Sequence, residues 1–227
     1  ICTDLILGLE LNRILKIPTR ILLRLKQQKC RDYPKLYNII KKFPWKDYLK
    51  QENIEFIVSA TKSRLIHSGR IEDSATKGII DYFSANQIKE KIRIKNAPKQ
   101  KIFLRLYDDT LTISLDSSGE LLHKRSVDNF RGHAGIRENY AAACLFLLIQ
   151  ASKRSHFQDI TLIDPMCGSA TILKEAKSFT NLNIRNFAYS NWNIKLDELQ
   201  TKSNIKKQVN RIWNFKDIIG IERDNEI

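Results

Sequence analysis

The stretch "LIDPMCGSATILKEA" at residues 162–176 decides how this sequence is interpreted. A short apolar segment ends in Asp164, a proline follows, and small residues from Cys167 to Ala170 lead into a helical pattern. This strand–turn–helix pattern is typical of a doubly wound α/β sheet, in which ligands bind beyond the carboxyl ends of the strands. The turn also meets the free N–H groups and the positive dipole end of the next helix. The sequence therefore predicts a small-ligand site here.

The residues of the turn narrow the choice of ligand. Gly168 is the one glycine between Asp164 and the helix, so the turn lacks both the G-x-G-x-x-G of a dinucleotide site and the Lys-Ser/Thr of a triphosphate site. A carboxylate such as Asp164 repels phosphate but accepts hydrogen bonds from an ammonium group. Glu222 follows a second apolar run, "DIIGIE", where it can accept from ribose hydroxyls. S-adenosylmethionine carries both an ammonium group and a ribose, so it is the predicted ligand. The alternative is that Asp164 only caps the following helix.

Hydrophobic periodicity divides the chain into two parts. Alternating patterns predict strands at 19–27 and 54–62 and a hairpin over 102–115, with helices between them, in the order β-α-β-α-β-β. In the second of these helices, Ile79, Ile80 and Phe83 are expected on one face. The second part predicts a helix at 136–152, a buried strand at 159–164 and a helix at 169–179.

Composition sets the broad class. A net charge of +14 indicates a polyanionic partner such as nucleic acid, with solubility and compositional bias as the alternative. The apolar run at 140–149 is too short for a membrane span. Four cysteines without a C-x-x-C pair favour reduced thiols in a cytoplasmic protein without a metal site. The start lacks a signal-peptide pattern and looks like the middle of a longer protein, so we expect a fragment.

Several stretches have counterparts in one family. "LIDPMCGSATILKEA" resembles the motif D-P-M-C-G-S-G-T-I-x-x-E-A, and "KSRLIHSGRIEDSATKGIIDYF" resembles a K-S-x-L-x-H stretch. "ISLDSSGELLHKR" is similar to L-D-T-S-G-E-x-L-H-K-R, "IRENYAAACL" to P-L-R-E-N-L-A-A-A, and "IRNFAYSNWN" to R-x-F-A-F-E-x-W. Taken in their order along the chain, these stretches resemble those of the THUMP-domain RNA methyltransferases, in particular the bacterial 23S ribosomal RNA guanine-N2 methyltransferases.

The resemblance implies a fold and a division into domains. It implies a THUMP α/β module at 1–116, a linker at 117–135 and the first part of a Rossmann-like, class I methyltransferase sheet at 136–227. It also explains the spacing of 222 − 164 = 58 residues between the two acids, where about 20 is usual, by a family insertion after the first methylase helix.

The resemblance also implies roles for individual residues. The residues matching the S-adenosylmethionine site are Asp164, Met166, Cys167, Gly168, Ser169, Thr171, Glu222 and Asp224. Those expected to bind RNA are Lys62, Ser63, Arg64, His67, Lys77, Lys124 and Arg125. For the basic residues a solvated face is the alternative, for His67 a packed core position, and for Cys167 a small residue fitting a tight loop rather than a reactive thiol.

Two departures from the family pattern bear on activity. Ala170 stands where the family has glycine, and at a positive φ alanine costs roughly 1 kcal/mol or more. The family's N-P-P-Y or D-P-P-Y catalytic loop does not occur in the 227 residues, so we expect the catalytic residues beyond Ile227 and no turnover by this chain alone.

The expected function is S-adenosylmethionine-dependent methylation of the exocyclic N2 of a guanine in 23S-type ribosomal RNA, without a metal and without a membrane. Two alternatives stay open. One is a non-catalytic RNA-binding protein with a decayed methylase half. The other is an adenine-N6 methylase acting on DNA or RNA. The target nucleotide and the oligomeric state do not follow from the sequence.

Overall fold

The computed structural model describes residues 4–49, 53–86, 99–125, 135–154, 157–179, 181–194 and 215–223. The chain forms two compact units. Unit 1 consists of residues 1–20, 120–185 and 196–227, and unit 2 of residues 21–119 and 186–195. Part of the expected linker, residues 126–134, lies outside the described residues.

Unit 2 is an α/β layer built on a four-stranded sheet with the order β1-β4-β3-β2. β2 and β3 run parallel, while β4 is antiparallel to both of its neighbours. The elements are β1 (Leu22–Lys29), α2 (Tyr33–Lys41), η1 (Trp45–Asp47), β2 (Ile54–Thr61), α3 (Ser68–Ala85), β3 (Gln100–Tyr107), β4 (Thr110–Asp116) and η2 (Ala188–Asn191). Within residues 22–116 this is the β-α-β-α-β-β order that the sequence predicts.

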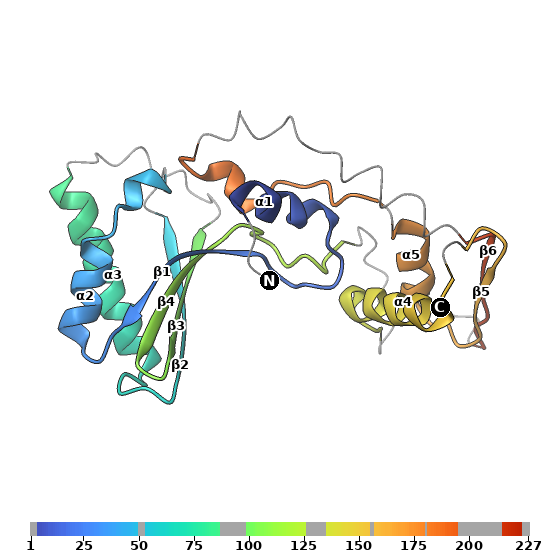
Figure 1. The fold of residues 1–227 in the computed structure, drawn as a ribbon, viewed down its shortest axis with the longest axis horizontal. Helices are drawn as coiled ribbons and strands as arrows, with labels where there is room; N and C mark the ends of the chain where they lie inside the picture. The colour runs from blue at the N-terminus through green and yellow to red at the C-terminus, as the bar shows by residue number, and fades with distance from the viewer. Residues whose placement is uncertain are drawn as a thin grey trace. The chain divides into compact units, whose positions relative to one another are not determined.

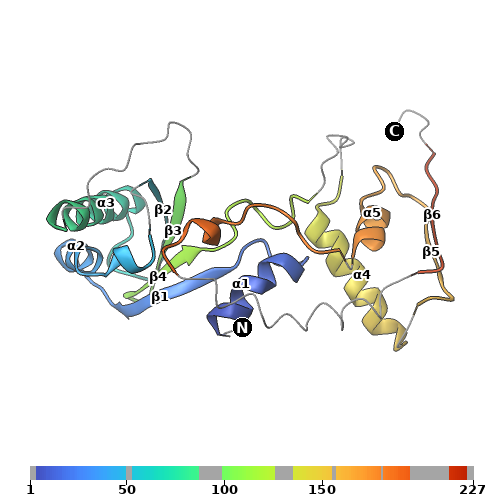
Figure 2. The ribbon, with the colours of Figure 1, turned by 90° about the horizontal axis from the view of Figure 1, so that it is seen from above.

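The core of unit 2 lies between the sheet and two helices. Alternate residues of β3 and β4 are at most 1% exposed: Ile102, Leu104, Leu106, Leu111, Ile113 and Leu115. α2 and α3 cover one face of this sheet (Figures 1 and 2). α2 begins after Asp32, whose side chain accepts from the Lys35 N–H, and it carries Pro34 in its first turn, which suits a helix start.

The third helix differs from the sequence expectation. α3 begins at Ser68, earlier than the periodic pattern indicates, and its buried face is made by Ile71, Ala75, Gly78, Ile79, Tyr82 and Phe83. Ile80 is 56% exposed, so its expected place in the core is wrong. Residues 71, 75 and 79 follow a spacing of four, and Ile80 lies about 100° further around the helix.

Unit 1 contains a two-stranded parallel sheet and three helices among its described residues. The elements are α1 (Leu5–Ile14), α4 (Glu138–Ser152), β5 (Thr161–Asp164), α5 (Thr171–Ser178) and β6 (Asp217–Gly220). α5 lies between α4 and the β5–β6 pair (Figures 1 and 2). The helix–strand–helix order at 136–179 agrees with the sequence prediction, whereas α1, capped by Asp4, was not expected.

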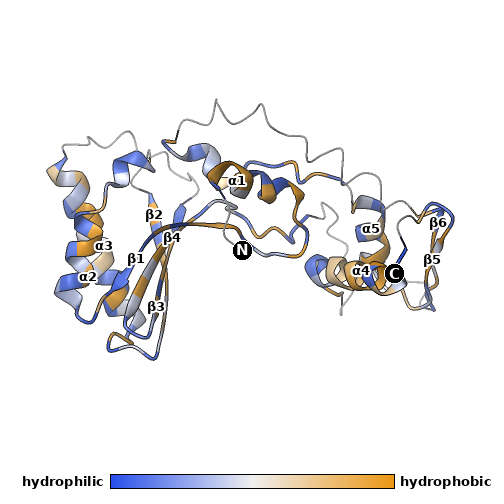
Figure 3. Ribbon diagram, viewed as in Figure 1, coloured by the Kyte–Doolittle hydropathy of each residue, from blue (hydrophilic) through white to orange (hydrophobic). Residues whose placement is uncertain are grey.

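α4 is the most apolar of the helices in unit 1, and Figure 3 shows it as largely hydrophobic. Ala141, Leu145 and Ile149 are buried, but Leu147 is well exposed. Nowhere in the described part of the chain is a helix both long and apolar enough to cross a lipid bilayer.

Candidate functional site

The carboxyl ends of β5 and β6 form the predicted ligand edge. The two strands are parallel neighbours, with Asp164 paired to Gly220, so their carboxyl ends meet. The chain stays paired just beyond the strands, because the Ile221 N–H donates to the Asp164 carbonyl at 2.9 Å and the Cys167 N–H donates to the Ile221 carbonyl at 3.0 Å. The loop after β5 and the residues after β6 therefore face each other.

Both predicted carboxylates lie at this edge. The Gly168 N–H donates to Glu222 Oε2 at 2.6 Å, and the Arg223 N–H donates to Glu222 Oε1 at 2.8 Å. Asp164 Oδ1 accepts from the Met166 N–H at 3.2 Å. A carboxylate offers about four acceptor positions, so Asp164 keeps capacity for a ligand's ammonium donors.

The turn has an unusual backbone. Gly168 has φ +46°, and among the described residues a Cβ built there would meet only Glu222 Oε2, at 4.0 Å, so no described side chain crowds this position. Ala170 has φ 57° and ψ 28°, in the left-handed region, just before the first residue of α5. The position therefore does require a positive φ, and alanine is strained there by roughly 1 kcal/mol.

Hydroxyls and one glycine complete the edge. Ser169 Oγ and Thr171 Oγ1 are 3.2 Å apart at the start of α5. Gly220 was not predicted, yet a Cβ there would lie 2.5 Å from Leu173 Cδ1 and 2.9 Å from Cys167 Sγ. Gly220 thus allows α5 and the turn to approach β6 closely. A glycine within a strand pattern, as in "IIGIE", is the signal for such an approach.

All of the predicted cofactor residues that the structure describes lie at this edge of the sheet. Those at the end of β5, in the turn, at the start of α5 or just after β6 are Asp164, Met166, Cys167, Gly168, Ser169, Thr171 and Glu222. Met166 is 84% exposed. Asp224 lies outside the described residues.

The free thiols differ in their surroundings. Cys167 is half-buried against Gly220, which agrees with its interpretation as a small packing residue. Cys30 in unit 2 is fully buried, and burial raises the pKa of its thiol to about 11. Cys144 is exposed on α4. Among the described residues, no cluster of His, Cys, Asp and Glu that could hold a metal ion is found.

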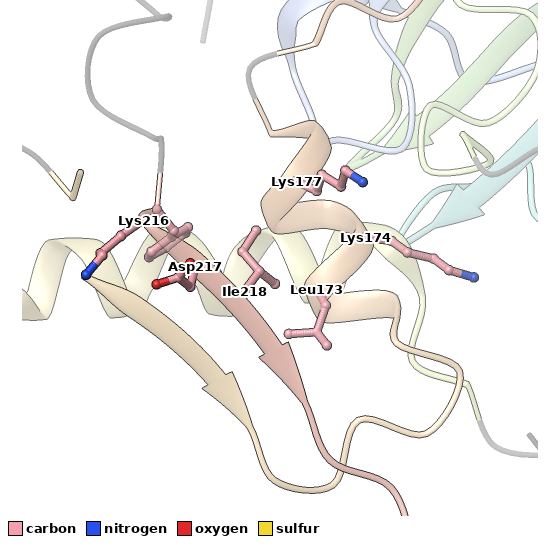
Figure 4. Close-up of a pocket in the computed structure, with 7 residues that line it drawn as sticks. Leu173, Lys174, Lys177, Lys216, Asp217 and Ile218 are labelled. Carbon is pink, nitrogen blue, oxygen red and sulfur yellow. The ribbon is translucent and has the colours of Figure 1, made fainter. Parts of the chain in front are cut away.

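A groove of about 450 Å³ lies between α5 and β6 (Figure 4). It is lined by Leu173, Lys174, Lys177, Phe215, Lys216, Asp217 and Ile218. Its strand residues belong to the amino end of β6, the end opposite to the ligand edge. In Figure 4, Leu173 and Ile218 lie between helix and strand, while the ammonium groups of Lys174 and Lys177 point away from β6. The groove is therefore not the predicted cofactor site. The ammonium groups of its lysines also do not converge on a point where an anion could bind.

In unit 2, the loop after β2 carries the first predicted RNA-binding residues. Lys62 and Arg64 are exposed, and Ser63 is half-buried. Ser63 Oγ accepts from the Asp109 N–H at 3.0 Å, and the Arg64 N–H donates to Asp109 Oδ1 at 2.8 Å. This backbone hydrogen bond, together with nearby Arg31 and Arg64, lowers the pKa of Asp109. The loop is thereby held against the β3–β4 turn.

Further basic and aromatic groups lie around this turn. Arg31 Nε donates to Asp109 Oδ2 at 3.1 Å, and Lys29 Nζ donates to the Asp108 carbonyl at 2.8 Å. Lys62 Nζ lies 5.9 Å from the ring centre of Tyr107, which is half exposed. Sequence reasoning missed this group. The "DD" between two alternating strands marked the turn, but it did not indicate that Lys29 at the end of β1 and Arg31 just after it reach the turn.

The other predicted RNA-binding residues are more scattered. His67 precedes α3 and is exposed, so the alternative of a packed core histidine is wrong. Lys77 is exposed on α3, and Lys124 is exposed and 3.7 Å from Glu120 Oε1. Arg125 differs, because its side chain is only 11% exposed and pairs with Glu175. Its donors are occupied within unit 1, so we leave it out of the RNA-binding proposal.

Comparisons with known proteins relate this geometry to a family. Residues 125–227 match the model of the RMKL-like methyltransferase domain. The ribosomal RNA large subunit methyltransferase K/L of Marinomonas sp. (strain MWYL1) is 32% identical over 162 residues, which is 71% of this chain and 22% of that protein. The chain thus spans about a fifth of the length of this curated relative.

Solved structures share the fold. A protein from Listeria monocytogenes str. 4b F2365, described as a predicted N6-adenine-specific DNA methylase, is 25% identical and has a TM-score of 0.75. The match covers 99% of this chain and 59% of that one. The protein SMU.472, solved in complex with S-adenosylhomocysteine, is 24% identical with a TM-score of 0.72, over 98% of this chain and 59% of that one.

These matches confirm the predicted α/β fold. Over residues 125–227 the chain matches the RMKL-like methyltransferase domain, and 71% of it is similar to a large-subunit ribosomal RNA methyltransferase. The expected THUMP module and the guanine-N2 specificity stay predictions.

Proposed function

We propose that this chain binds S-adenosylmethionine at the carboxyl edge of β5 and β6 and takes part in methylation of large-subunit ribosomal RNA. The observation that carries the proposal is the meeting of Asp164, Gly168 and Glu222 at that edge, although 58 residues separate the two acids. It is supported by the family match over residues 125–227 and by the S-adenosylhomocysteine bound to a protein of the same fold.

The groups present at the edge fit this cofactor. Asp164 offers a carboxylate oxygen to the amino group of the methionine part, because only its Oδ1 is engaged, by Met166, among the described residues. Glu222 is placed to accept from the ribose hydroxyls beside Gly168. The open space at Gly168 lets a ligand approach the backbone. When bound, S-adenosylmethionine supplies an electrophilic methyl group to an attacking amine. Asp224 is proposed to stand near the ribose, on the strength of the motif.

The target that we propose is the exocyclic N2 of a guanine. It is supported by the motif resemblance and by the name of the relative, which is a large-subunit ribosomal RNA methyltransferase. The Asn/Asp-Pro-Pro-aromatic loop of the family does not occur among these 227 residues. We therefore assign no catalytic residue to this chain, whose role is to hold the cofactor and RNA.

Residues 1–116 are proposed to act as a THUMP module that binds the RNA backbone. Lys62 and Arg64 are exposed beside Arg31 and Tyr107 around the β3–β4 turn. Cations neutralise phosphates and position the RNA without reading its sequence. Ser63, His67 and Lys77 are additional proposed contacts of this module, and Lys124 in the linker is a further one.

The decisive experiment is calorimetry with S-adenosylhomocysteine on the chain and on Asp164→Ala. We expect binding in the wild type and its loss in the variant, with RNA affinity nearly unchanged. The matched control is the double variant Lys62→Ala/Arg64→Ala, which should bind the cofactor normally and RNA more weakly. Unchanged cofactor affinity in Asp164→Ala would refute the site assignment.

Two other functions have some support. The strained Ala170 favours a non-catalytic RNA-binding protein with a decayed methylase half. The name of the Listeria protein favours adenine-N6 methylation. The first predicts that the wild type binds no S-adenosylhomocysteine. The second predicts that duplex DNA competes with a ribosomal RNA fragment for the chain at equal salt concentration.

A further inference from the structure

The guanidinium of Arg125 is the centre of a buried polar cluster in unit 1. Its Nε donates to Glu175 Oε1 at 3.2 Å and its Nη2 to Glu175 Oε2 at 2.7 Å, which makes a bidentate ion pair. The two side chains are only 11% and 5% exposed. A lysine could not replace Arg125 here, because a single ammonium group does not form the two parallel hydrogen bonds that a planar guanidinium makes with a carboxylate.

The same guanidinium also reaches three backbone carbonyls. Nη1 donates to the carbonyls of Lys16 and Leu122, each at 2.9 Å, and Nη2 donates to the Glu138 carbonyl at 3.2 Å. One side chain thus connects α5 to the segment after α1, to the segment at 120–125 and to the first residue of α4.

Glu175 lies on the helix that carries the ligand turn. It follows Thr171, the first residue of α5, by four positions, so both project from the same face of the helix. Thr171 is in contact with Ser169 in the turn. An anchor at Glu175 therefore fixes both the rotation of α5 and the place of its first turn.

A role in orientation explains this pair better than a role in stability. Removing two charges from water costs several kcal/mol per ion, so a buried pair is often no more stabilising than apolar side chains of similar volume. Leaving one partner alone is unfavourable, because the remaining charge is buried without compensation. The pair instead specifies one arrangement of the helix.

We propose that Arg125 is a positioning residue that acts through Glu175 to hold the first turn of α5 in its cofactor-binding arrangement. This inference rests on the proposed function, and it replaces the expectation that Arg125 contacts RNA. Arg125 touches no cofactor atom in this role. It affects cofactor affinity by fixing the positions of Ser169 and Thr171 relative to Asp164.

The test is S-adenosylhomocysteine affinity, measured by calorimetry on the full chain at low temperature. We expect Arg125→Met and Glu175→Gln to weaken binding at least about tenfold, since small misplacements of binding groups are costly. Arg125→Lys, which keeps the charge but not the bidentate geometry, should recover part of the loss. Circular dichroism establishes that each variant is folded, and Glu175→Gln gives the answer if Arg125→Met does not fold.

Two controls separate positioning from general stability. Arg185 also donates to backbone carbonyls, those of Leu121 and Glu120, so Arg185→Lys should leave affinity unchanged. Gly78→Ala, which destabilises unit 2, should also leave the S-adenosylhomocysteine affinity unchanged. Wild-type affinity in both Arg125→Met and Glu175→Gln would overturn this inference alone. A wild-type chain that binds no S-adenosylhomocysteine would refute the proposed function, and the inference with it.

Discussion

The two sheets of this protein are stabilised in different ways. In unit 2, β3 and β4 bury a continuous row of aliphatic side chains under two helices, and Ile102, Leu104 and Ile113 are completely inaccessible to water. In unit 1, the described part of the sheet is a single parallel pair, and Ile163 and Ile219 are about half exposed. Among the described residues, the first sheet is held by packing, whereas the second is held by backbone hydrogen bonds and a few close contacts.

This difference matters because the candidate cofactor site belongs to the less packed sheet. Its turn contains a left-handed alanine, and its close contact depends on Gly220. Local strain can be maintained only where the surroundings determine the conformation. In unit 1 the buried Arg125–Glu175 pair supplies such a constraint at the helix that follows the turn.

Hydrogen exchange should give the largest contrast between the sheets. We expect the amides of β3 and β4 to exchange at least about a thousandfold more slowly than those of β5 and β6, because few buried side chains resist opening of the latter. Mass spectrometry on peptides from the whole chain measures this. Equal protection of the two sheets would show that burial among the described residues does not govern their stability.

A pair of glycine substitutions in α3 tests the packing of unit 2. A Cβ at Gly78 would lie 2.9 Å from the Tyr37 carbonyl oxygen, so Gly78→Ala should destabilise the protein by about 1–3 kcal/mol. Gly69 lies in the same helix, and a Cβ there would meet no atom of the described residues within 4 Å, so Gly69→Ala should be neutral or stabilising by up to about 1 kcal/mol. Urea denaturation measures both. Similar effects at the two positions would argue against close α2–α3 contact.

The sequence predicted most elements because the residues that form them also show their period. Ile102, Leu104 and Leu106 alternate in the chain and are buried in the structure. Asp164 and Glu222 were predicted because each follows an apolar run. Contacts made by chain segments far apart were missed, such as Arg31 with Asp109 and Arg125 with Glu175. A long basic side chain looks the same in sequence whether it meets water, RNA or a buried carboxylate.

Ala170→Gly tests the strain in the ligand turn of unit 1. Glycine adopts a positive φ without steric cost, so we expect the free energy of unfolding of unit 1 to rise by about 1 kcal/mol. We also expect tighter binding of S-adenosylhomocysteine. Denaturation and calorimetry measure the two effects, with Ala176→Gly, within α5, as a destabilising control. A loss of stability in Ala170→Gly comparable to that control would contradict the strain assigned to this turn.

The smallest expected effect is a pH dependence of unit 1 that arises at Lys16. Burial, followed by the charge of Arg125, lowers the pKa of Lys16 to about 8, while Glu175 acts in the opposite direction. Between pH 8 and the ordinary value near 10.5, the unfolded chain binds more protons at this residue than the folded chain does. The contribution of Lys16 to stability therefore rises with pH across this window.

We expect this rise to be roughly half a kcal/mol per pH unit, less than the full linkage value, because the group remains partly hydrated. The measurement is urea denaturation of the wild type and of Lys16→Met at pH 7, 8.5 and 10, taking the difference between the two proteins so that other titrating groups cancel. The stability of Lys16→Met relative to the wild type should be highest at pH 7, where the wild type holds a charged lysine beside Arg125. This difference in stability should shrink as the pH rises. A difference that stays constant would mean that Lys16 is fully solvated in the folded protein, and the buried cluster around Arg125 would then be more open than its contacts indicate.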